Sequence, residues 1–327
     1  MCPTHVQASV LHGERDIRIQ DRELAAPSSN EVQVRVSSTG LCGSDLHYYN
    51  HYRNGDIVVR EPLTLGHESS GTVVAVGDGV TDLAPGDRVA LEVGQPCEAC
   101  EYCQSGRYNI CRGMKFRSSA KAFPHAQGTL QEKINHPARW CYKLPAEVSS
   151  DLGALIEPLS VAMHAFDRAA LPPSPTVLTI DEKLAYAREV SETIKATKVN
   201  GQEVGEVSVV YECTGVETCV QTSIYSAKPG GKIMIIGMGN PILTLPMSAA
   251  ALREVDLVGV FRYANTYQRA IEMLSKPPKT LPDLTKLITQ RFTGLDHIQD
   301  AFKMAGQIKD ADGNLVIKVF IELPESS

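Results

Sequence analysis

Apolar and polar side chains alternate along the first part of the chain. Val32, Val34 and Val36 are separated by polar residues, which is the period of a half-buried β-strand. Residues 71–77 and 87–91 are two more apolar stretches bordered by glycine turns. This part of the chain is therefore expected to be rich in β-structure.

The pattern changes after residue 150. Residues 207–211 and 232–236 are short β-branched runs that lead into glycine-containing turns, as buried parallel strands do. Residues 181–197 carry apolar side chains at helical spacing and predict an amphipathic helix. The same reading predicts two further strands and one loop, at residues 176–178, 315–321 and 172–175.

This order of elements predicts an α/β protein in which one domain is inserted into another. The chain begins with β-structure, alternates strands and helices in the middle, and returns to a strand at its end. We expect a first domain formed by residues 1–150 and about 291–327, and a second formed by residues 151–290.

Composition narrows the class of protein. The 327 residues are 43% hydrophobic, which is enough to bury two cores, and the net charge of −6 argues against a nucleic-acid partner. No apolar run reaches the roughly 18 residues of a membrane span, and no secretory signal or peroxisomal address is recognised. We expect a soluble, cytoplasmic protein whose nine cysteines are reduced.

Four of these cysteines form the strongest chemical signal. Cys97, Cys100, Cys103 and Cys111 follow the spacing Cys-x2-Cys-x2-Cys-x7-Cys. Four thiolates brought together by tight turns are the ligand set of a tetrahedral structural zinc. Four unrelated buried thiols and an iron–sulfur cluster are the two alternatives.

A second group of metal-binding residue types is spread over three segments. Cys42 and the pair His67-Glu68 each follow a β-like stretch, and Glu157 lies within an apolar segment where an unpartnered carboxylate would be costly. Three protein ligands with one open position are typical of a catalytic zinc. Asp45 is a candidate to orient the His67 ring without binding the metal itself.

Several motifs carry a family resemblance. Gly66-His67-Glu68-x2-Gly71-x5-Gly77-x2-Val80 resembles the signature of zinc-containing medium-chain alcohol dehydrogenases. Residues 42–48 and 156–161, the four-cysteine segment, and residues 212–217 and 259–263 are similar to the polyol branch of that family, the sorbitol, xylitol and L-arabinitol dehydrogenases. The resemblance implies a β-rich GroES-like domain and a Rossmann-type parallel sheet.

The resemblance also implies roles for individual residues. The catalytic zinc ligands that it implies are Cys42, His67, Glu68 and Glu157, the last of them either directly or through a water. It also implies that Ser44 carries the alcohol proton. Substrate hydroxyls are implied to bind four residues: Tyr48, Glu157, Arg262 and Tyr263. The nicotinamide side of NAD is implied to bind two segments: Ile236, Gly237 and Met238, and Val260, Phe261 and Arg262. It further implies a small-molecule polyol substrate and a homotetramer.

One segment departs from the family pattern. The family's cofactor domain opens with a strand, a Gly-x-Gly-x-x-Gly turn and a helix whose N-terminus binds the pyrophosphate. Here no glycine occurs between Gly153 and Gly201, and Leu178 leads almost directly to the predicted helix at residues 181–197. About fifty residues, or one and a half strand–helix–strand units, are missing from the expected pattern. We therefore expect a truncated Rossmann-type sheet that lacks the first glycine-rich βαβ segment.

These observations leave three hypotheses. The first is a zinc-dependent polyol dehydrogenase that oxidises a secondary alcohol of a sugar alcohol to a ketose with NAD. The second is a zinc-binding but catalytically impaired relative, or a truncated gene model, that does not bind NAD normally. The third, a zinc-ribbon interaction module, would not need the second ligand set with Cys42 and His67. The sequence does not select the polyol, nor NAD over NADP.

Overall fold

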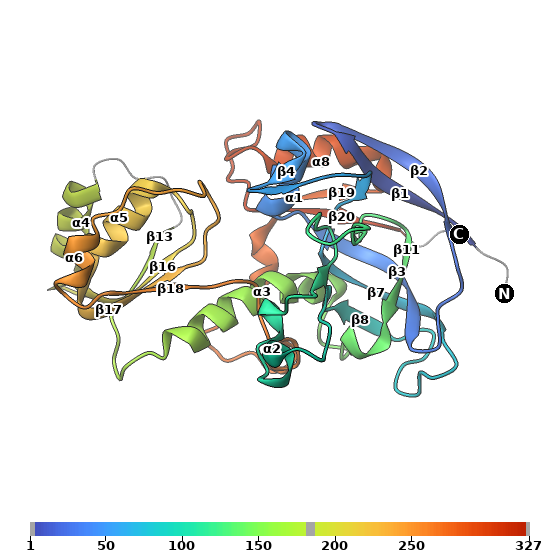
Figure 1. Cartoon of the computed structure of the whole chain (residues 1–327), viewed down its shortest axis with the longest axis horizontal. Coiled ribbons are helices and arrows are strands. Elements are labelled where there is room, and N and C mark those ends of the chain that lie inside the picture. The colour runs from blue at the N-terminus through green and yellow to red at the C-terminus, as the bar shows by residue number, and fades with distance from the viewer. Residues whose placement is uncertain (1–3, 181–186, 325–327) are drawn as a thin grey trace. The chain divides into compact units, whose positions relative to one another are not determined.

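The computed structural model describes residues 4–180 and 187–324. Its chain divides into two compact units, one formed by residues 1–160 and 264–327 and the other by residues 161–263. The N-terminal strands and the C-terminal helix and strand belong to the same unit, which we call unit 1, and the inserted segment is unit 2 (Figure 1). None of the described helices combines the length and apolar composition needed to cross a membrane.

The larger sheet of unit 1 has seven strands. Its order is β12-β8-β7-β3-β20-β19, and β11 also pairs with β3. The strands are β3 (Glu31–Gly40), β7 (Glu68–Val76), β8 (Arg88–Leu91), β11 (Lys133–Pro137), β12 (Cys141–Lys143), β19 (Ile288–Thr293) and β20 (Lys318–Glu322). All pairings are antiparallel except β19 with β20.

The predicted strands at residues 32–36, 71–77 and 87–91 are confirmed by β3, β7 and β8. Alternate valines of β3 enter a core that extends to Cys111 of the four-cysteine segment and to Met114 just after it.

A smaller three-stranded sheet of order β2-β1-β6, one hairpin and one further antiparallel pair complete the β-structure described for unit 1. The strands of this sheet are β1 (Thr4–Gly13), β2 (Asp16–Leu24) and β6 (Leu63–Thr64). The hairpin is β4 (Arg53–Asn54) with β5 (Ile57–Val58), and β9 (Gly94–Gln95) forms a separate antiparallel pair with β10 (Lys115–Phe116). The helices are α1 (Gly43–His51), α2 (Glu101–Gln104), η1 (Tyr108–Ile110), η2 (Ala138–Trp140), α7 (Tyr267–Ser275), η3 (Leu284–Leu287), η4 (Leu295–His297) and α8 (Ile298–Ala305). Helices α1 and α8 share a core with the smaller sheet, in which the rings of Tyr49 and Phe302 stack.

Unit 2 is built on a four-stranded parallel sheet of order β13-β16-β17-β18. Its strands are β13 (Val177–Ile180), β16 (Val207–Glu212), β17 (Ala227–Ile235) and β18 (Asp256–Gly259), with a hairpin of β14 (Lys198–Val199) and β15 (Gln202–Glu203). Its helices are α4 (Ala187–Ala196), α5 (Glu217–Ser226) and α6 (Met247–Ala251). Helices α4 and α5 pack side by side, and α5 and α6 lie over the sheet (Figure 1).

Helix α3 (Ser150–Ala169) belongs to both units, because the division of the chain falls after Ser160. Its first half packs Ala154 and Leu155 against Phe320 of unit 1, and its last turns pack Ala165 and Ala169 against the sheet of unit 2.

The predicted parallel strands in unit 2 are confirmed by β13, β16 and β17, and the predicted loop at residues 172–175 is confirmed as well. Helix α4 confirms the part of the predicted helix 181–197 that begins at Ala187, and residues 181–186 lie outside the described residues.

The strand predicted at residues 315–321 begins later than expected. Strand β20 starts at Lys318, and the side chains of Leu315 and Ile317 are more than half exposed, at 56% and 55%. The reason is a turn at residues 310–314. The Asp310 carboxylate accepts hydrogen bonds from the backbone amides of Asp312 and Asn314, so this segment is held in a turn before the strand begins.

The compact units also divide at other places than the limits expected near residues 150 and 290. The first half of α3 contributes to the core of unit 1, as described above. Helix α7 is also part of unit 1, where the Tyr267 hydroxyl donates a hydrogen bond to the Leu91 carbonyl at 2.8 Å. Which unit serves as catalytic domain and which as cofactor domain stays a prediction.

Gly71 is required by close packing between β3 and β7. A Cβ atom at this position would lie 2.2 Å from the carbonyl oxygen of Arg35. Gly306, at the end of α8, is a contrasting position, because its Cβ would lie 3.5 Å from the nearest atom and its φ of −81° suits any residue.

We predict that Gly71→Ala lowers the free energy of unfolding by about 2 kcal/mol or more, because strand β3 must move to admit the methyl group. Gly306→Ala should change it by no more than about 1 kcal/mol. Urea unfolding of the two variants checks this, and equal stability of the two would contradict the packing argument.

Candidate metal centres

The pairing of β3 with β7 brings three candidate ligands together. Gly40 lies opposite Glu68 in the ladder, so the chain leaving β3 passes Cys42 close to the residues that enter β7. The Cys42 Sγ, a ring nitrogen of His67 and a carboxylate oxygen of Glu68 all lie within 4.8 Å of one another. One soft thiolate, one imidazole and one carboxylate at this separation suit a zinc ion.

Glu68 is held by a lysine that sequence analysis missed. Its carboxylate, 1% exposed, forms an ion pair with the Lys318 ammonium through Oε1 at 2.5 Å. The other oxygen, Oε2, is buried and has no hydrogen-bond partner among the described residues. A cation bound beside Cys42 would satisfy that oxygen. The signal that could have revealed Lys318 was a single charge within the apolar run of residues 315–321.

Asp45 lies behind His67, as predicted. Its Oδ1 is 3.3 Å from Nδ1 of His67 and accepts hydrogen bonds from the Ser118 hydroxyl at 2.6 Å and the Gly66 amide at 3.1 Å. Burial opposes its ionisation, but the attraction of His67 and these hydrogen bonds outweigh burial and hold the pKa of Asp45 below its ordinary value. The carboxylate thus faces Nδ1 of the ring, and Nε2 is the ring nitrogen left for a metal.

Helix α1, which starts beside this cluster, carries Ser44 and Tyr48. The Ser44 hydroxyl is 3.5 Å from Nε2 of His67. The Tyr48 ring is buried, and its hydroxyl accepts a hydrogen bond from the Ala120 amide at 3.2 Å. Cys42 is the N-cap of this helix, so its first two turns carry one candidate ligand and two predicted site residues.

Glu157 lies outside the group formed by Cys42, His67 and Glu68. It is buried on α3. Burial is the largest influence on the pKa of Lys318 and lowers it, but the negative charges of Glu68, Cys42 and Glu157 raise it, and the pKa of Lys318 lies above its ordinary value. Its predicted role as a ligand, direct or through a water, stays a prediction.

The four cysteines of the other candidate centre converge around a short loop. The Sγ atoms of Cys97 and Cys103 are 4.0 Å apart, those of Cys100 and Cys103 are 3.6 Å apart, and those of Cys100 and Cys111 are 3.8 Å apart. A hydrogen bond from the Cys103 amide is the main influence that lowers the pKa of Cys100 to about 6. The described cysteines are all free thiols, so this group fits a structural zinc.

A buried carboxylate supports the four-cysteine lobe, which we define as residues 97–111. Glu92 accepts hydrogen bonds from the hydroxyls of Tyr108 and Tyr142, each at 2.8 Å, and it is 1% exposed. Burial raises the pKa of Glu92 to about 7, although both tyrosines lower it. Sequence analysis missed this group, because nothing in the pattern places Tyr142 near Tyr108.

The predicted cofactor residues lie in unit 2 at the carboxyl ends of parallel strands. Residues 236–238 follow β17, residues 260–262 follow β18, and the Val260 amide donates a hydrogen bond to the Ile235 carbonyl at 2.9 Å. A Cβ on Gly237 would lie 2.1 Å from the Gly215 amide, so the two glycine turns pack backbone to backbone.

Arg262 and Tyr263, which are predicted to bind substrate, end unit 2. The Arg262 guanidinium lies 4.6 Å from the centroid of the Phe261 ring, and Tyr263 is buried. Their contact with a substrate stays a prediction.

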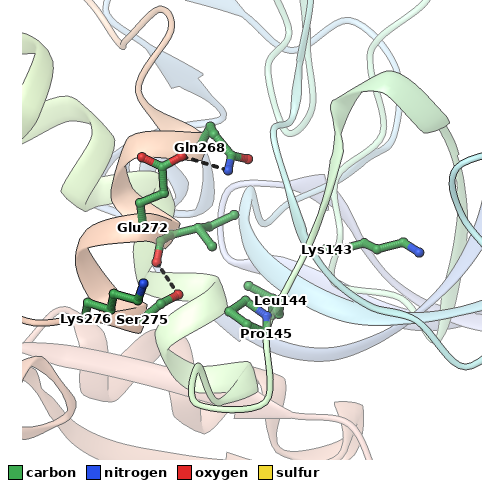
Figure 2. A pocket seen from close by; sticks show the side chains of 8 residues that line it. Lys143, Leu144, Pro145, Gln268, Glu272, Ser275 and Lys276 are labelled. Carbon is green, nitrogen blue, oxygen red and sulfur yellow. Dashed lines mark hydrogen bonds between the residues drawn. The ribbon is translucent and has the colours of Figure 1, made fainter.

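A groove of about 690 Å³ lies apart from the predicted site residues. Figure 2 shows it between the segment that follows β12 and helix α7. Its lining residues are Lys143, Leu144, Pro145, Gln268, Ile271, Glu272, Ser275 and Lys276. None of them is a candidate ligand, so we assign it no part in the chemistry.

We predict two zinc ions per chain in the purified protein, because each centre offers a complete set of protein ligands. Cys100→Ser should lower the content to one ion, and His67→Ala should lower it to one ion by emptying the other centre. Metal analysis by mass spectrometry checks both. Loss of both ions in either variant would mean that the centres are not independent.

We predict that Glu92 makes stability depend on pH. Its folded pKa of about 7 exceeds the ordinary 4.5, so the folded state binds more protons between these values and the free energy of unfolding falls as pH rises. The loss amounts to about 3 kcal/mol in total. Glu92→Gln should lack it. Urea unfolding at several pH values and constant zinc checks this, and parallel profiles would contradict it.

Comparison with known proteins identifies the family. The model of the alcohol dehydrogenase GroES-like domain matches residues 28–146, and that of the zinc-binding dehydrogenases matches residues 178–276. Sorbitol dehydrogenase of Gallus gallus is 39% identical over 334 aligned positions, which cover 90% of this chain and 92% of that protein. Sorbitol dehydrogenase of Arabidopsis thaliana is 36% identical over 357 positions, which cover 97% and 95%.

Solved structures agree with this fold. An oxidoreductase of unknown specificity from Escherichia coli has a TM-score of 0.82 and 27% identity, covering 98% of this chain and all of that chain. L-idonate 5-dehydrogenase from the same species has a TM-score of 0.82 and 23% identity, with 98% and 99% covered. With its GroES-like domain, its parallel Rossmann-type sheet and its two cysteine-containing centres, the chain belongs to the zinc-containing medium-chain alcohol dehydrogenase family.

Proposed function

We propose that this protein is a zinc-dependent polyol dehydrogenase that oxidises a secondary alcohol of a sugar alcohol to a ketose with NAD. The observation that carries the proposal is the convergence of Cys42, His67 and Glu68, in a chain about 39% identical to sorbitol dehydrogenases. The carbinol carbon loses a hydride to the nicotinamide and its hydroxyl loses a proton, which yields a ketose, reduced dinucleotide and one proton.

The protein's own residues prepare the metal site. When bound, zinc acts as a Lewis acid that favours loss of the hydroxyl proton near neutral pH. Asp45 lies 3.3 Å from Nδ1 of His67 and would steady the ring, and Lys318 pairs with one oxygen of Glu68 and leaves the other for a cation. The Lys318 ammonium also offsets the anionic charge of Cys42 and Glu68, which would otherwise repel each other in a buried site.

Helix α1 carries two residues proposed to act on the substrate, Ser44 in proton transfer and Tyr48 in binding. The Ser44 hydroxyl next to His67 can accept the proton that leaves the substrate and pass it to solvent. Because the Tyr48 hydroxyl already accepts the Ala120 amide, its own hydrogen remains to be donated to a substrate hydroxyl. Glu157, Arg262 and Tyr263 are proposed to bind the remaining hydroxyls. A homotetramer stays the expected assembly.

The glycine turns of unit 2 lie where ligands bind in sheets of this kind. Gly215 and Gly237 let the turns that follow β16 and β17 pack backbone to backbone at the carboxyl ends of these strands. The nicotinamide supplies the hydride acceptor. Residues 236–238 and 260–262 would line its side of the site.

The pyrophosphate half fits less well, which supports the second hypothesis, a zinc-binding relative with impaired NAD binding. No glycine lies between Gly153 and Gly201, so the expected turn after β13 is missing from the sequence. The alignment to the Gallus gallus enzyme spans 334 positions but only 90% of these 327 residues, about 294, so about 40 positions face gaps in this chain. A lost βαβ segment, in the protein or in a truncated gene model, would account for such gaps.

The expected effect on affinity is large. Three hydrogen bonds to the pyrophosphate, at about 1.5–3 kcal/mol each, and a helix dipole of up to about 2 kcal/mol together contribute at least about 5 kcal/mol. Their loss weakens binding by a factor of about 10³–10⁴.

We predict that NADH binds with a dissociation constant of about 1 mM or weaker, for this reason. Titration by nicotinamide fluorescence or calorimetry checks it. Saturable binding in the micromolar range would contradict the impairment and favour a fully working dehydrogenase.

Activity tests the main proposal separately. At about 10 mM NAD, zinc-loaded protein should form NADH from sorbitol, xylitol or arabinitol, because high cofactor compensates for weak binding. His67→Ala should abolish it. Absence of NADH formation from all three polyols under these conditions would reject the proposed activity and leave the second hypothesis.

A further inference from the structure

The four-cysteine lobe carries a loop that is closed by two of its cysteines. Cys103 and Cys111 are the candidate metal ligands at its ends, and residues 104–110 lie between them. Within this loop the Gly106 backbone has a φ of 74°, and Tyr108 begins the short helix η1. A metal bound by both cysteines would fix the ends of this segment and so its conformation.

Both hydrogen-bond acceptors for Asn265 lie in that loop. The Asn265 amide donates to the Tyr108 hydroxyl at 2.7 Å, and its side-chain Nδ2 donates to the Gly106 carbonyl at 2.8 Å. The Tyr108 hydroxyl in turn donates to the buried carboxylate of Glu92 at 2.8 Å. The loop is therefore tied to the core of unit 1 on one side and to Asn265 on the other.

Asn265 lies where the chain re-enters unit 1. The boundary between the units falls between Tyr263 and Ala264. Ala264 is 8% exposed and Thr266 is fully buried, so the residues on both sides of Asn265 are packed into the protein. Tyr267 adds a second attachment through its hydrogen bond to the Leu91 carbonyl, the residue before Glu92.

The backbone around this boundary needs such attachments. Arg262 has a φ of 54° and Asn265 a φ of 59°. Both values lie in the left-handed region, which residues other than glycine and asparagine rarely adopt. An arginine in this conformation persists when neighbouring contacts hold the chain. The proposed substrate residues Arg262 and Tyr263 are covalently joined to the segment that the loop holds.

We propose that the metal-closed loop of the four-cysteine lobe is a positioning element for substrate binding: through Tyr108 and Gly106 it holds Asn265, and so fixes the stretch of chain from which Arg262 and Tyr263 extend. The structural metal thereby contributes to polyol recognition as well as to folding. The part that concerns substrate rests on the proposed function, and the holding of Asn265 does not.

Hydrogen–deuterium exchange of the full-length, zinc-loaded protein tests the holding of Asn265. Tyr108→Phe should speed exchange of the Asn265 amide about tenfold, the equivalent of one lost hydrogen bond, and Cys100→Ser should do the same by releasing the loop. Tyr142→Phe is the matched control, because it removes an equal hydrogen bond to Glu92 without touching Asn265. It should leave that amide within about twofold of the wild type.

Two measurements show that the variants remain folded. Zinc content should stay at two ions per chain in Tyr108→Phe and Tyr142→Phe. The fluorescence of Trp140, the single tryptophan, reports on the lobe because its ring lies 5.2 Å from that of Tyr108. An Asn265 amide that exchanges at the wild-type rate in both Tyr108→Phe and Cys100→Ser would overturn the proposal.

Kinetics test the consequence for substrate. Tyr108→Phe should raise KM for a polyol about tenfold and leave kcat and the KM for a simple secondary alcohol, such as 2-propanol, nearly unchanged. An equal change for both alcohols would reject the positioning role. Because the exchange experiment uses neither polyol nor nucleotide, absence of any dehydrogenase activity would count against the proposed function and would not decide the holding of Asn265.

Discussion

The register of β3 against β7 is the constraint on which the candidate catalytic centre depends. With Gly40 opposite Glu68, the thiol of Cys42 and the ring of His67 lie at the same end of the ladder. A slip of one residue would turn each side chain of β7 to the other face and separate the ligands. The absence of a side chain at Gly71 lets the two strands approach closely enough to keep this register.

A third strand completes the centre electrostatically. Strand β20 pairs with β3 through Phe320 and Gly40, which brings Lys318 beside Glu68. Cys42, Glu68 and Glu157 are potential anions near one another, and burying them without a cation would be unfavourable. Here the Lys318 ammonium is a cation that the fold itself supplies. The C-terminal strand therefore belongs to the metal site as much as the segments that carry the ligands.

The four-cysteine lobe shows how a structural metal site connects to its surroundings. Its cysteines surround a short loop, which packs against the apolar core of unit 1 and also donates a hydrogen bond from Tyr108 to the buried Glu92. A buried carboxylate with a raised pKa makes such a connection sensitive to its hydrogen-bond partners. Metal binding and the position of the returning chain at Asn265 are thus linked by a short series of contacts.

The sequence by itself determined the metal chemistry and the class of fold. Ligand type and spacing are local properties, so Cys97 to Cys111 predicted one centre, and valines at alternate positions predicted strands. Helix α3 was not predicted, because Gly153 and Pro158 within it disfavour a helix locally and only packing in both units offsets that cost. The tertiary structure alone decided the partners of Glu68 and Glu92, since Lys318 and Tyr142 meet them through strand pairing between distant segments, which no local pattern encodes.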